Sequence, residues 1–259
     1  SNITGYTATL GGNVTSDGGP GDPFFPLTER GVVLSPTALN DNPFIGGTDV
    51  SLVNDPTTNT GIFELGVAML SPGTTYSYRA YAINSVGVSY TTSIGTFTTL
   101  DFPAVTSPTV TNVTSRSATL GANVTSNGGA PILARGVIIF LGSNPSFTVA
   151  AASAGTGIFT LNVSLTPGRT YRFLPYARNS VGTSFGLDTT FTTPGALANL
   201  SDPTLSSITS TSATLGAKVS NDGGAAVTAR GFVYSITSSN SNPEINGLDV
   251  TQVSAGNGT

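Results

Sequence analysis

The chain has 259 residues, only 8% of them charged, and a formal net charge of -4 at pH 7. Its single lysine and scattered arginines do not form the clustered positive charge that binds nucleic acid, so a polyanionic partner is not expected. The absence of Cys and His excludes disulfides and a zinc site, and no run of apolar residues is long enough to span a membrane.

One phrase occurs three times along the chain. It reads ATLGGNVTSDGG from Ala8, ATLGANVTSNGG from Ala118 and ATLGAKVSNDGG from Ala213, and an Arg-Gly pair with apolar residues follows each copy. A second phrase occurs twice, as YSYRAYAINSVG from Tyr76 and YRFLPYARNSVG from Tyr171. The last two copies of the first phrase, and the two copies of the second, are each 95 residues apart, which indicates a tandem array of repeats.

Each repeat is predicted to consist of β-strands. Residues 117–126 alternate between apolar and polar side chains, as a half-buried strand does. The DGG or NGG that ends this phrase supplies residues that tolerate positive φ for a chain reversal. Apolar residues then follow the Arg-Gly pair, and alternation returns over 157–165 and 171–177. No helical period is found, and about seven short strands per repeat are typical of an all-β sandwich.

Two corner segments resemble a known family. LSPGTTY (70–76) and LTPGRTY (165–171) look like the Leu-x-Pro-Gly-x-x-Tyr corner of fibronectin type III domains, and the segments that follow are similar to the sixth and last strands of that family. The resemblance implies that Tyr76 and Tyr171 place their rings in the core and their hydroxyls on backbone upstream. The second-strand Trp of the family is missing, and its space is expected to be filled by Leu10, Leu120 and Leu215.

The phrase ATLGG-x-V-T-x-x-GG, followed by RGV, is similar to repeats of very long bacterial surface proteins, adhesins of the Bacteroidetes type among them. This resemblance covers essentially the whole chain. It implies tandem fibronectin type III or immunoglobulin-like β-sandwiches in a rod-like array.

Alignment of the repeats predicts three modules. Residues 1–100 form a module with enlarged loops and an incomplete first strand, residues 101–194 a complete module, and residues 195–259 the first half of a third. We expect a window on a longer array, or a third module completed by strands from a neighbouring chain. The linkers LDFPAVTSPTV from Leu100 and PGALANLSDPTL from Pro194 contain prolines that favour extended, semi-rigid connections.

Three arginines hold the same place in the three repeats: Arg30, Arg135 and Arg230 each precede a glycine. One interpretation is a ligand-binding guanidinium. A position common to every repeat favours the other, in which each arginine bridges backbone carbonyls or a carboxylate within its own module. Val or Phe follows each Arg-Gly pair, which excludes an integrin-type Arg-Gly-Asp loop.

No catalytic residue and no metal ligand set is expected. GTSFG at 182–186 matches the nucleophile-elbow pattern, but the chain has no histidine to take the serine proton. No cofactor is predicted except calcium at a linker or a loop of the first repeat, an alternative to solvated loop acids. The carboxylates that bear on it are Asp17, Asp22, Asp41, Asp49, Asp55, Asp101 and Asp202.

The enlarged loops of the first repeat carry apolar tips, Phe24 with Phe25 and Phe44 with Ile45. They are expected to contact a partner or a neighbouring subunit, or to fold back over the next module, and the second and third repeats are taken to lack them. Seven Asn-x-Ser/Thr sequons are candidates for N-glycosylation, although a chain rich in these residues also produces them by chance. They are Asn2, Asn13, Asn112, Asn123, Asn162, Asn199 and Asn257.

The sequence therefore predicts a non-enzymatic structural or adhesive segment of a long extracellular repeat protein, acting as a stalk or cell-surface adhesin. Its expected partners are other modules of the same chain, neighbouring copies, and surface glycans or proteins. Two alternatives stay open. The chain is a subunit of a polymeric extracellular filament that uses the loops of the first repeat, or it carries accessory modules of a secreted carbohydrate-active enzyme.

Overall fold

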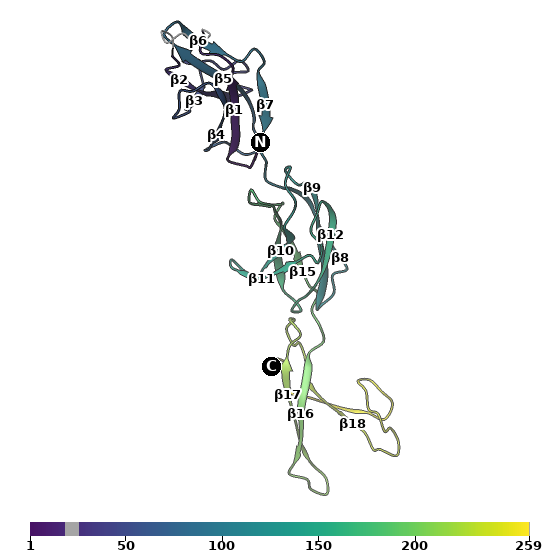
Figure 1. The fold of residues 1–259 in the computed structure, drawn as a ribbon. Helices are drawn as coiled ribbons and strands as arrows, with labels where there is room; N and C mark the ends of the chain where they lie inside the picture. The colour runs from purple at the N-terminus through teal and green to yellow at the C-terminus, as the bar shows by residue number, and fades with distance from the viewer. Residues whose placement is uncertain (19–25, 259) are drawn as a thin grey trace.

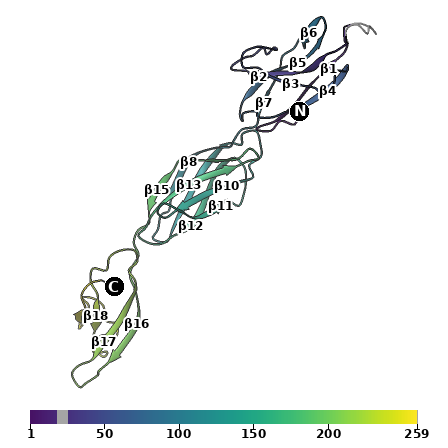
Figure 2. The same ribbon diagram turned by 90° about the vertical axis from the view of Figure 1, so that its left-hand side faces the viewer.

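The computed structural model describes residues 1–18 and 26–258. Within these residues all regular structure is β, and every strand pair is antiparallel. The strands of the three repeats occupy successive lengths of an elongated molecule (Figure 1). A view turned by 90° shows the same succession from the first repeat to the third (Figure 2).

The second repeat is a sandwich of two sheets. One sheet has the strand order β12-β9-β8, and the other has the order β11-β10-β13-β14, with β15 also paired to β13. This is the arrangement of a fibronectin type III or immunoglobulin-like sandwich, so the predicted fold class is confirmed. The strands are β8 (Ala104–Thr111), β9 (Ser117–Ser126), β10 (Ala134–Phe140), β11 (Pro145–Ala150), β12 (Gly157–Ser164), β13 (Thr170–Arg178), β14 (Thr183–Phe185) and β15 (Thr189–Thr192).

The core of the second repeat lies between these two sheets. Leu120 from β9, Val137 and Ile139 from β10, and Phe173 from β13 are all 0% exposed and belong to one apolar cluster. Their alternation along each strand is what a sheet with one buried face requires. Burial of such side chains is the main favourable contribution to folding.

The first repeat has the same layout with one strand fewer in its smaller sheet. β1 pairs with β4, and the larger sheet has the order β3-β2-β5-β6, with β7 paired to β5. Ser1 exchanges two backbone hydrogen bonds with Thr9, as Thr111 pairs with Thr119 in the second repeat. The strands are β1 (Ala8–Val14), β2 (Glu29–Pro36), β3 (Ser51–Asn54), β4 (Gly61–Val67), β5 (Thr75–Asn84), β6 (Gly87–Tyr90) and β7 (Gly95–Thr98).

The third repeat consists of two separate ribbons. β16 (Asn199–Ser206) pairs with β17 (Thr214–Asn221), and β18 (Gly231–Tyr234) pairs with β19 (Thr251–Ser254). None of its described apolar side chains belongs to a buried core. Leu215, the counterpart of Leu120, is 38% exposed.

Two of the linker prolines lie inside strands. Pro108 falls in β8 and Pro203 in β16, and the strand register shifts next to each of them. The residues before them, Ser107 and Asp202, have φ of 53° and 55°. A bulge accommodates proline because the extra residue does not need a ladder N–H.

The second enlarged loop is shared by the first and third repeats, which corrects the expectation that only the first repeat has it. Asn40 Nδ2 donates to Thr48 O at 3.0 Å, and Asn240 Nδ2 donates to Leu248 O at 2.9 Å. Phe44 at the tip is replaced by Glu244, whereas Ile45 has a counterpart in Ile245, and the backbone conformation stays the same. Only the second repeat has a short β10–β11 connection here.

Candidate functional site

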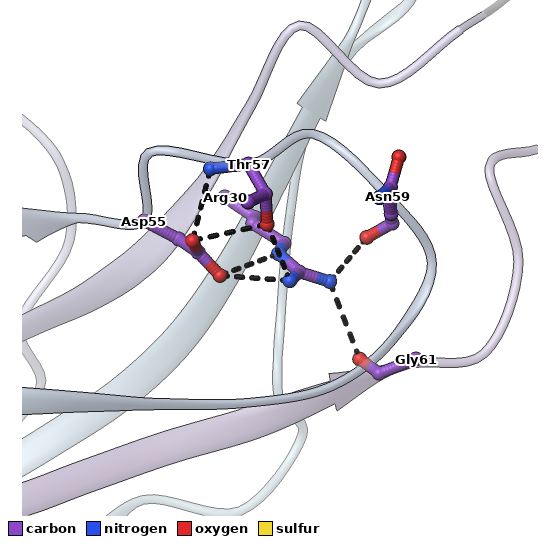
Figure 3. Close-up of polar contacts among 5 residues, drawn as sticks. All are labelled: Arg30, Asp55, Thr57, Asn59 and Gly61. Atoms are coloured by element: carbon purple, nitrogen blue, oxygen red, sulfur yellow. Dashed lines mark hydrogen bonds and ion pairs between the residues drawn. The ribbon is translucent and has the colours of Figure 1, made fainter.

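The first candidate site is the arginine of the repeated Arg-Gly pair, which is Arg30 in the first repeat. Arg30 extends from β2 into the loop between β3 and β4, where polar groups surround it (Figure 3). Its Nε and Nη2 both lie 2.8 Å from Asp55 Oδ2, and Nη2 also donates to Thr57 Oγ1 at 2.7 Å. Nη1 donates to the carbonyl oxygens of Asn59 and Gly61. The guanidinium therefore holds a whole loop in place.

Asp55 is fixed from both sides. The backbone N–H of Thr57 donates to Asp55 Oδ1 at 2.9 Å, and the Thr57 hydroxyl lies 3.0 Å from the same atom. The Thr57 backbone N–H, followed by the Thr57 hydroxyl and Arg30, lowers the pKa of the Asp55 carboxyl, while burial opposes this shift. The carboxylate is thus the favoured form in the folded first repeat.

The second repeat builds the same clamp without a carboxylate. Arg135 Nε donates to Ser153 O at 3.0 Å, and Nη1 lies 3.0 to 3.2 Å from the carbonyl oxygens of Gly155, Thr156 and Gly157. The guanidinium also lies over the Phe159 ring, 5.2 Å from its centroid. Arg135 is only 7% exposed, so its charge is satisfied inside the repeat.

The third arginine is not clamped. Arg230 is exposed, and its Nε donates to Ala255 O at 3.4 Å. The two clamped arginines have their donors occupied by protein oxygens, so they present no binding surface for a ligand. The geometry supports a structural role for Arg30 and Arg135.

The tyrosine corners have the geometry that the resemblance implies. Tyr76 Oη accepts a hydrogen bond from Ser71 N at 3.0 Å, and Tyr171 Oη accepts one from Thr166 N at 2.9 Å. Both rings are buried, and Tyr171 stacks on Phe191 with 5.8 Å between the ring centroids.

Sequence reasoning missed the threonine that closes each corner. The Thr193 hydroxyl, 1% exposed, lies 2.8 Å from Thr166 O and 3.2 Å from Arg169 O, and it accepts a hydrogen bond from Arg169 N. Thr99 makes the equivalent contacts in the first repeat. The signal was present in the repeated FTT, whose second threonine follows the strand.

The loop tip of the first repeat packs partly on its own sheet. Ile45 N donates to Tyr90 Oη at 2.8 Å, and Pro43 is fully buried. Phe44 is 49% exposed and is the apolar side chain that this tip offers to solvent. Phe24 and Phe25 lie outside the described residues.

The other candidate residues give no chemical site. Ser184 of the GTSFG segment lies in β14 and pairs with Ala177 of β13. Among residues 1–18 and 26–258, no three Asp, Glu, His or Cys side chains form a group that could hold a metal ion. The calcium hypothesis stays a prediction, and Asp22 is outside the described residues. Asn123 is half-buried, and the other sequon asparagines are exposed.

Backbone hydrogen bonds hold the first linker against both of the repeats that it joins. Asp101 N donates to Gly128 O at 2.7 Å, and Gly73 N donates to Leu100 O at 3.2 Å. Gly128 has a φ of 66°, and a Cβ placed on it would lie 2.0 Å from Asp101 O. Only glycine fits such an approach of two backbones. Gly223 has the same relation to Ala196 at the second linker.

No protein-family model matches the chain, and no curated protein matches it. No described helix is long and apolar enough to cross a membrane. Among solved structures, domains A168–A170 of titin are similar over 74% of this chain and 60% of that one, with 15% identity and a TM-score of 0.36. The FN1–FN3 domains of chicken CNTN1 are similar over 75% and 65%, with 15% identity and a TM-score of 0.32. The chain spans less than two thirds of either. The fold assignment rests on the strand order and register.

Proposed function

We propose that this chain is a non-enzymatic spacer segment of an extracellular repeat protein, serving as a stalk or as part of a cell-surface adhesin. The observation that carries the proposal is the close backbone packing at the linkers, where Gly128 leaves no space for a side chain against Asp101. A linker packed in this way fixes the orientation of one repeat relative to the next. The reach of the array then grows with the number of repeats.

The clamped arginines and the tyrosine corners support this function. They satisfy buried polar groups within the first and second repeats. The chain as a whole has few charges, and its surface is wetted by hydroxyls and amides. Contacts with glycans or proteins at a surface then fall to exposed loop residues such as Phe44. No step of this function requires a metal or a cofactor.

The proposal is tested by measuring how firmly the first two repeats are held together. The chain has no cysteine, so Ile62→Cys with Ile158→Cys gives two unique spin-label sites on exposed strand positions of the first and second repeats. Pulsed dipolar EPR on the full chain should give one narrow distance distribution. A broad distribution would show freely jointed repeats and would overturn the spacer proposal.

Location is tested separately. An antibody against the second repeat should label intact, unpermeabilised cells of the source organism. Labelling only after permeabilisation would contradict a surface role.

A second candidate function is a filament subunit, favoured by the exposed apolar face of the third repeat. Leu200 is 67% and Leu205 60% exposed on β16, where the second repeat buries Val105. Strands from a neighbouring copy would cover this face. Sedimentation of the full chain over a wide concentration range decides between the two. Growth into polymers supports the filament, and a constant monomer mass opposes it.

A further inference from the structure

The phrase NSVG, found once in the first repeat and once in the second, has a contact in the second repeat that the corner and core do not explain. Asn179 is 3% exposed. Its Oδ1 accepts hydrogen bonds from Val181 N at 2.9 Å and Gly182 N at 3.1 Å, which closes a turn. Its Nδ2 donates outward, to Asp101 O at 2.7 Å and Asn127 O at 2.9 Å.

Asp101 belongs to the linker and Asn127 to the turn after β9, so one amide group ties the linker to the second repeat. Both bonds go to backbone carbonyls, so they do not depend on which side chains the two accepting residues carry. The Asn179 amide uses all of its hydrogen-bonding capacity, so its loss leaves the carbonyls of Asp101 and Asn127 without this donor.

The valine of the phrase reaches the preceding repeat. A Cβ placed on Gly5 would lie 2.8 Å from Val181 Cγ1 and 3.4 Å from Leu100 O. Gly182 lies against the Phe102 ring in the same way, with 2.6 Å from a Cβ on the glycine to the nearest ring carbon. The NSVG turn of the second repeat is therefore packed against both the linker and the base of the first repeat.

The first repeat provides an internal comparison. Asn84 makes the same turn, with Oδ1 accepting from Val86 N at 2.9 Å and Gly87 N at 3.3 Å. Its Nδ2 donates to Asp17 O, the counterpart of Asn127 O, at 2.8 Å. Val86 is 77% exposed, whereas Val181 is half-buried against the first repeat. The turn thus forms without a neighbour, and the contact with a neighbour is additional.

At the second joint the backbones of the two repeats also meet closely, since a Cβ placed on Gly224 would lie 2.2 Å from Pro167 O. A cavity of about 140 Å³ opens there, lined by Arg116, Pro167 and Asp222 among others. Arg116 follows Ser115, which aligns with Gly5 of the first repeat. The cavity lies beside the region that Val181 fills at the first joint.

We infer that the NSVG turn is the docking element by which a repeat holds the repeat before it. Its asparagine binds the backbone of the incoming linker, and its valine packs on a glycine at the base of the preceding repeat. The partner it fits is the end of another repeat of this type, with an extended linker and a small residue at the position of Gly5. The inference rests on the proposed spacer function and names the residues that stiffen the joint.

The test uses the spin-label pair Ile62→Cys and Ile158→Cys in the full chain. Asn179→Ala should broaden the distance distribution, because loss of the bond to the linker carbonyl of Asp101 raises the population of undocked forms about tenfold. Asn84→Ala is the matched control, since it removes the same turn bonds without a linker in contact, and it should leave the distribution unchanged. Gly5→Val approaches the joint from the first repeat and should broaden the distribution as well.

Hydrogen exchange of β13 amides establishes that the second repeat is folded in each variant. If Asn179→Ala unfolds it, Gly5→Val still decides the question. Distributions of Asn179→Ala and Gly5→Val that superimpose on the parent would overturn the docking role, and so would equal broadening by Asn84→Ala. A parent distribution that is already broad would instead contradict the spacer function itself, so the two failures are distinguishable.

Discussion

The second and third repeats start from nearly the same sequence and reach different structures. Leu120 is 0% exposed in the second repeat, and its counterpart Leu215 is 38% exposed in the third. Arg135 has its guanidinium surrounded by carbonyl oxygens, whereas Arg230 makes one long contact. The difference shows that the repeated phrases specify strands and turns locally, while burial depends on the strands that follow, β12 and β13 above all.

The loop shared by the first and third repeats supports the same lesson from the other side. Asn40 and Asn240 make equivalent hydrogen bonds, although one loop lies on a complete sheet and the other does not. Asp49 and Asp249 both have a φ of 57°. A conformation that is stabilised by its own side-chain-to-backbone bonds does not need a core.

The largest expected effect on stability comes from replacing the equivalent leucines, Leu120 and Leu215, with alanine. Leu120→Ala should destabilise the second repeat by about 2–5 kcal/mol, because it leaves a cavity in a closed core. Leu215→Ala removes a partly exposed side chain and should cost less than about 1 kcal/mol in its own repeat. Hydrogen exchange read separately for β9 and β17 measures both. Equal losses would show that the third repeat has a core comparable to that of the second.

The next largest effect concerns the arginines. Arg135→Met should cost the second repeat about 1.5–3 kcal/mol, because carbonyls that receive charged hydrogen bonds lose their donor. Arg230→Met should change the third repeat little, since that side chain is exposed. The free energy of unfolding of each repeat, from hydrogen exchange, is the measurement. An Arg135→Met variant as stable as the parent would contradict the clamp.

Much of the strand pattern was predictable because alternation is a local property. Leu120 and Phe159 were correctly placed on inward faces from their spacing alone. The bulges at Pro108 and Pro203 were not predicted, because a bulge is visible only when the partner strand is known.

The contact between the first and second repeats was harder to predict from the sequence. Asn179 stands in a phrase whose repetition is explained by the turn it closes, and nothing in the sequence indicates that its second polar atom binds Asp101 O, 78 residues away. The loop of the third repeat was overlooked although the sequence shows it, because residues 42–50 read NPFIGGTDV and residues 242–250 read NPEINGLDV. The equivalent hydrogen bonds of Asn40 and Asn240 confirm the match.

A smaller effect is expected at the corner. Tyr171→Phe removes the acceptor for Thr166 N and should cost the second repeat about 1 kcal/mol, with the ring still stacked on Phe191. The same change at Tyr234, a tyrosine outside the corner that is 49% exposed in the third repeat, should have no measurable effect. Urea unfolding of the two variants and the parent provides the comparison. A Tyr171→Phe variant without a shifted transition would mean that the hydroxyl does not support the corner.

The smallest effect is a pH dependence that separates the first repeat from the other two. The pKa of Asp55 is lowered on folding, so its contribution to stability is complete at neutral pH, above the ordinary carboxyl pKa. That contribution is lost as the pH falls through the lowered value. The backbone N–H of Asp55 donates to Arg30 O. At the matching positions after β11 and β19, Ala151 N–H donates to Arg135 O and Ala255 N–H donates to Arg230 O, so the other two repeats have no carboxylate at this position.

Asp55→Asn should therefore weaken the first repeat at pH 7 and make its stability less sensitive to acid, while the second repeat behaves alike in both chains. The measurement is hydrogen exchange of β2 and β10 amides at several pH values, corrected for the intrinsic exchange rate. If acid weakened β2 in the variant as much as in the parent, the carboxylate would not be the group responsible. The arginine would then hold its loop through Thr57 and the two carbonyls alone, as Arg135 holds its own loop without a carboxylate.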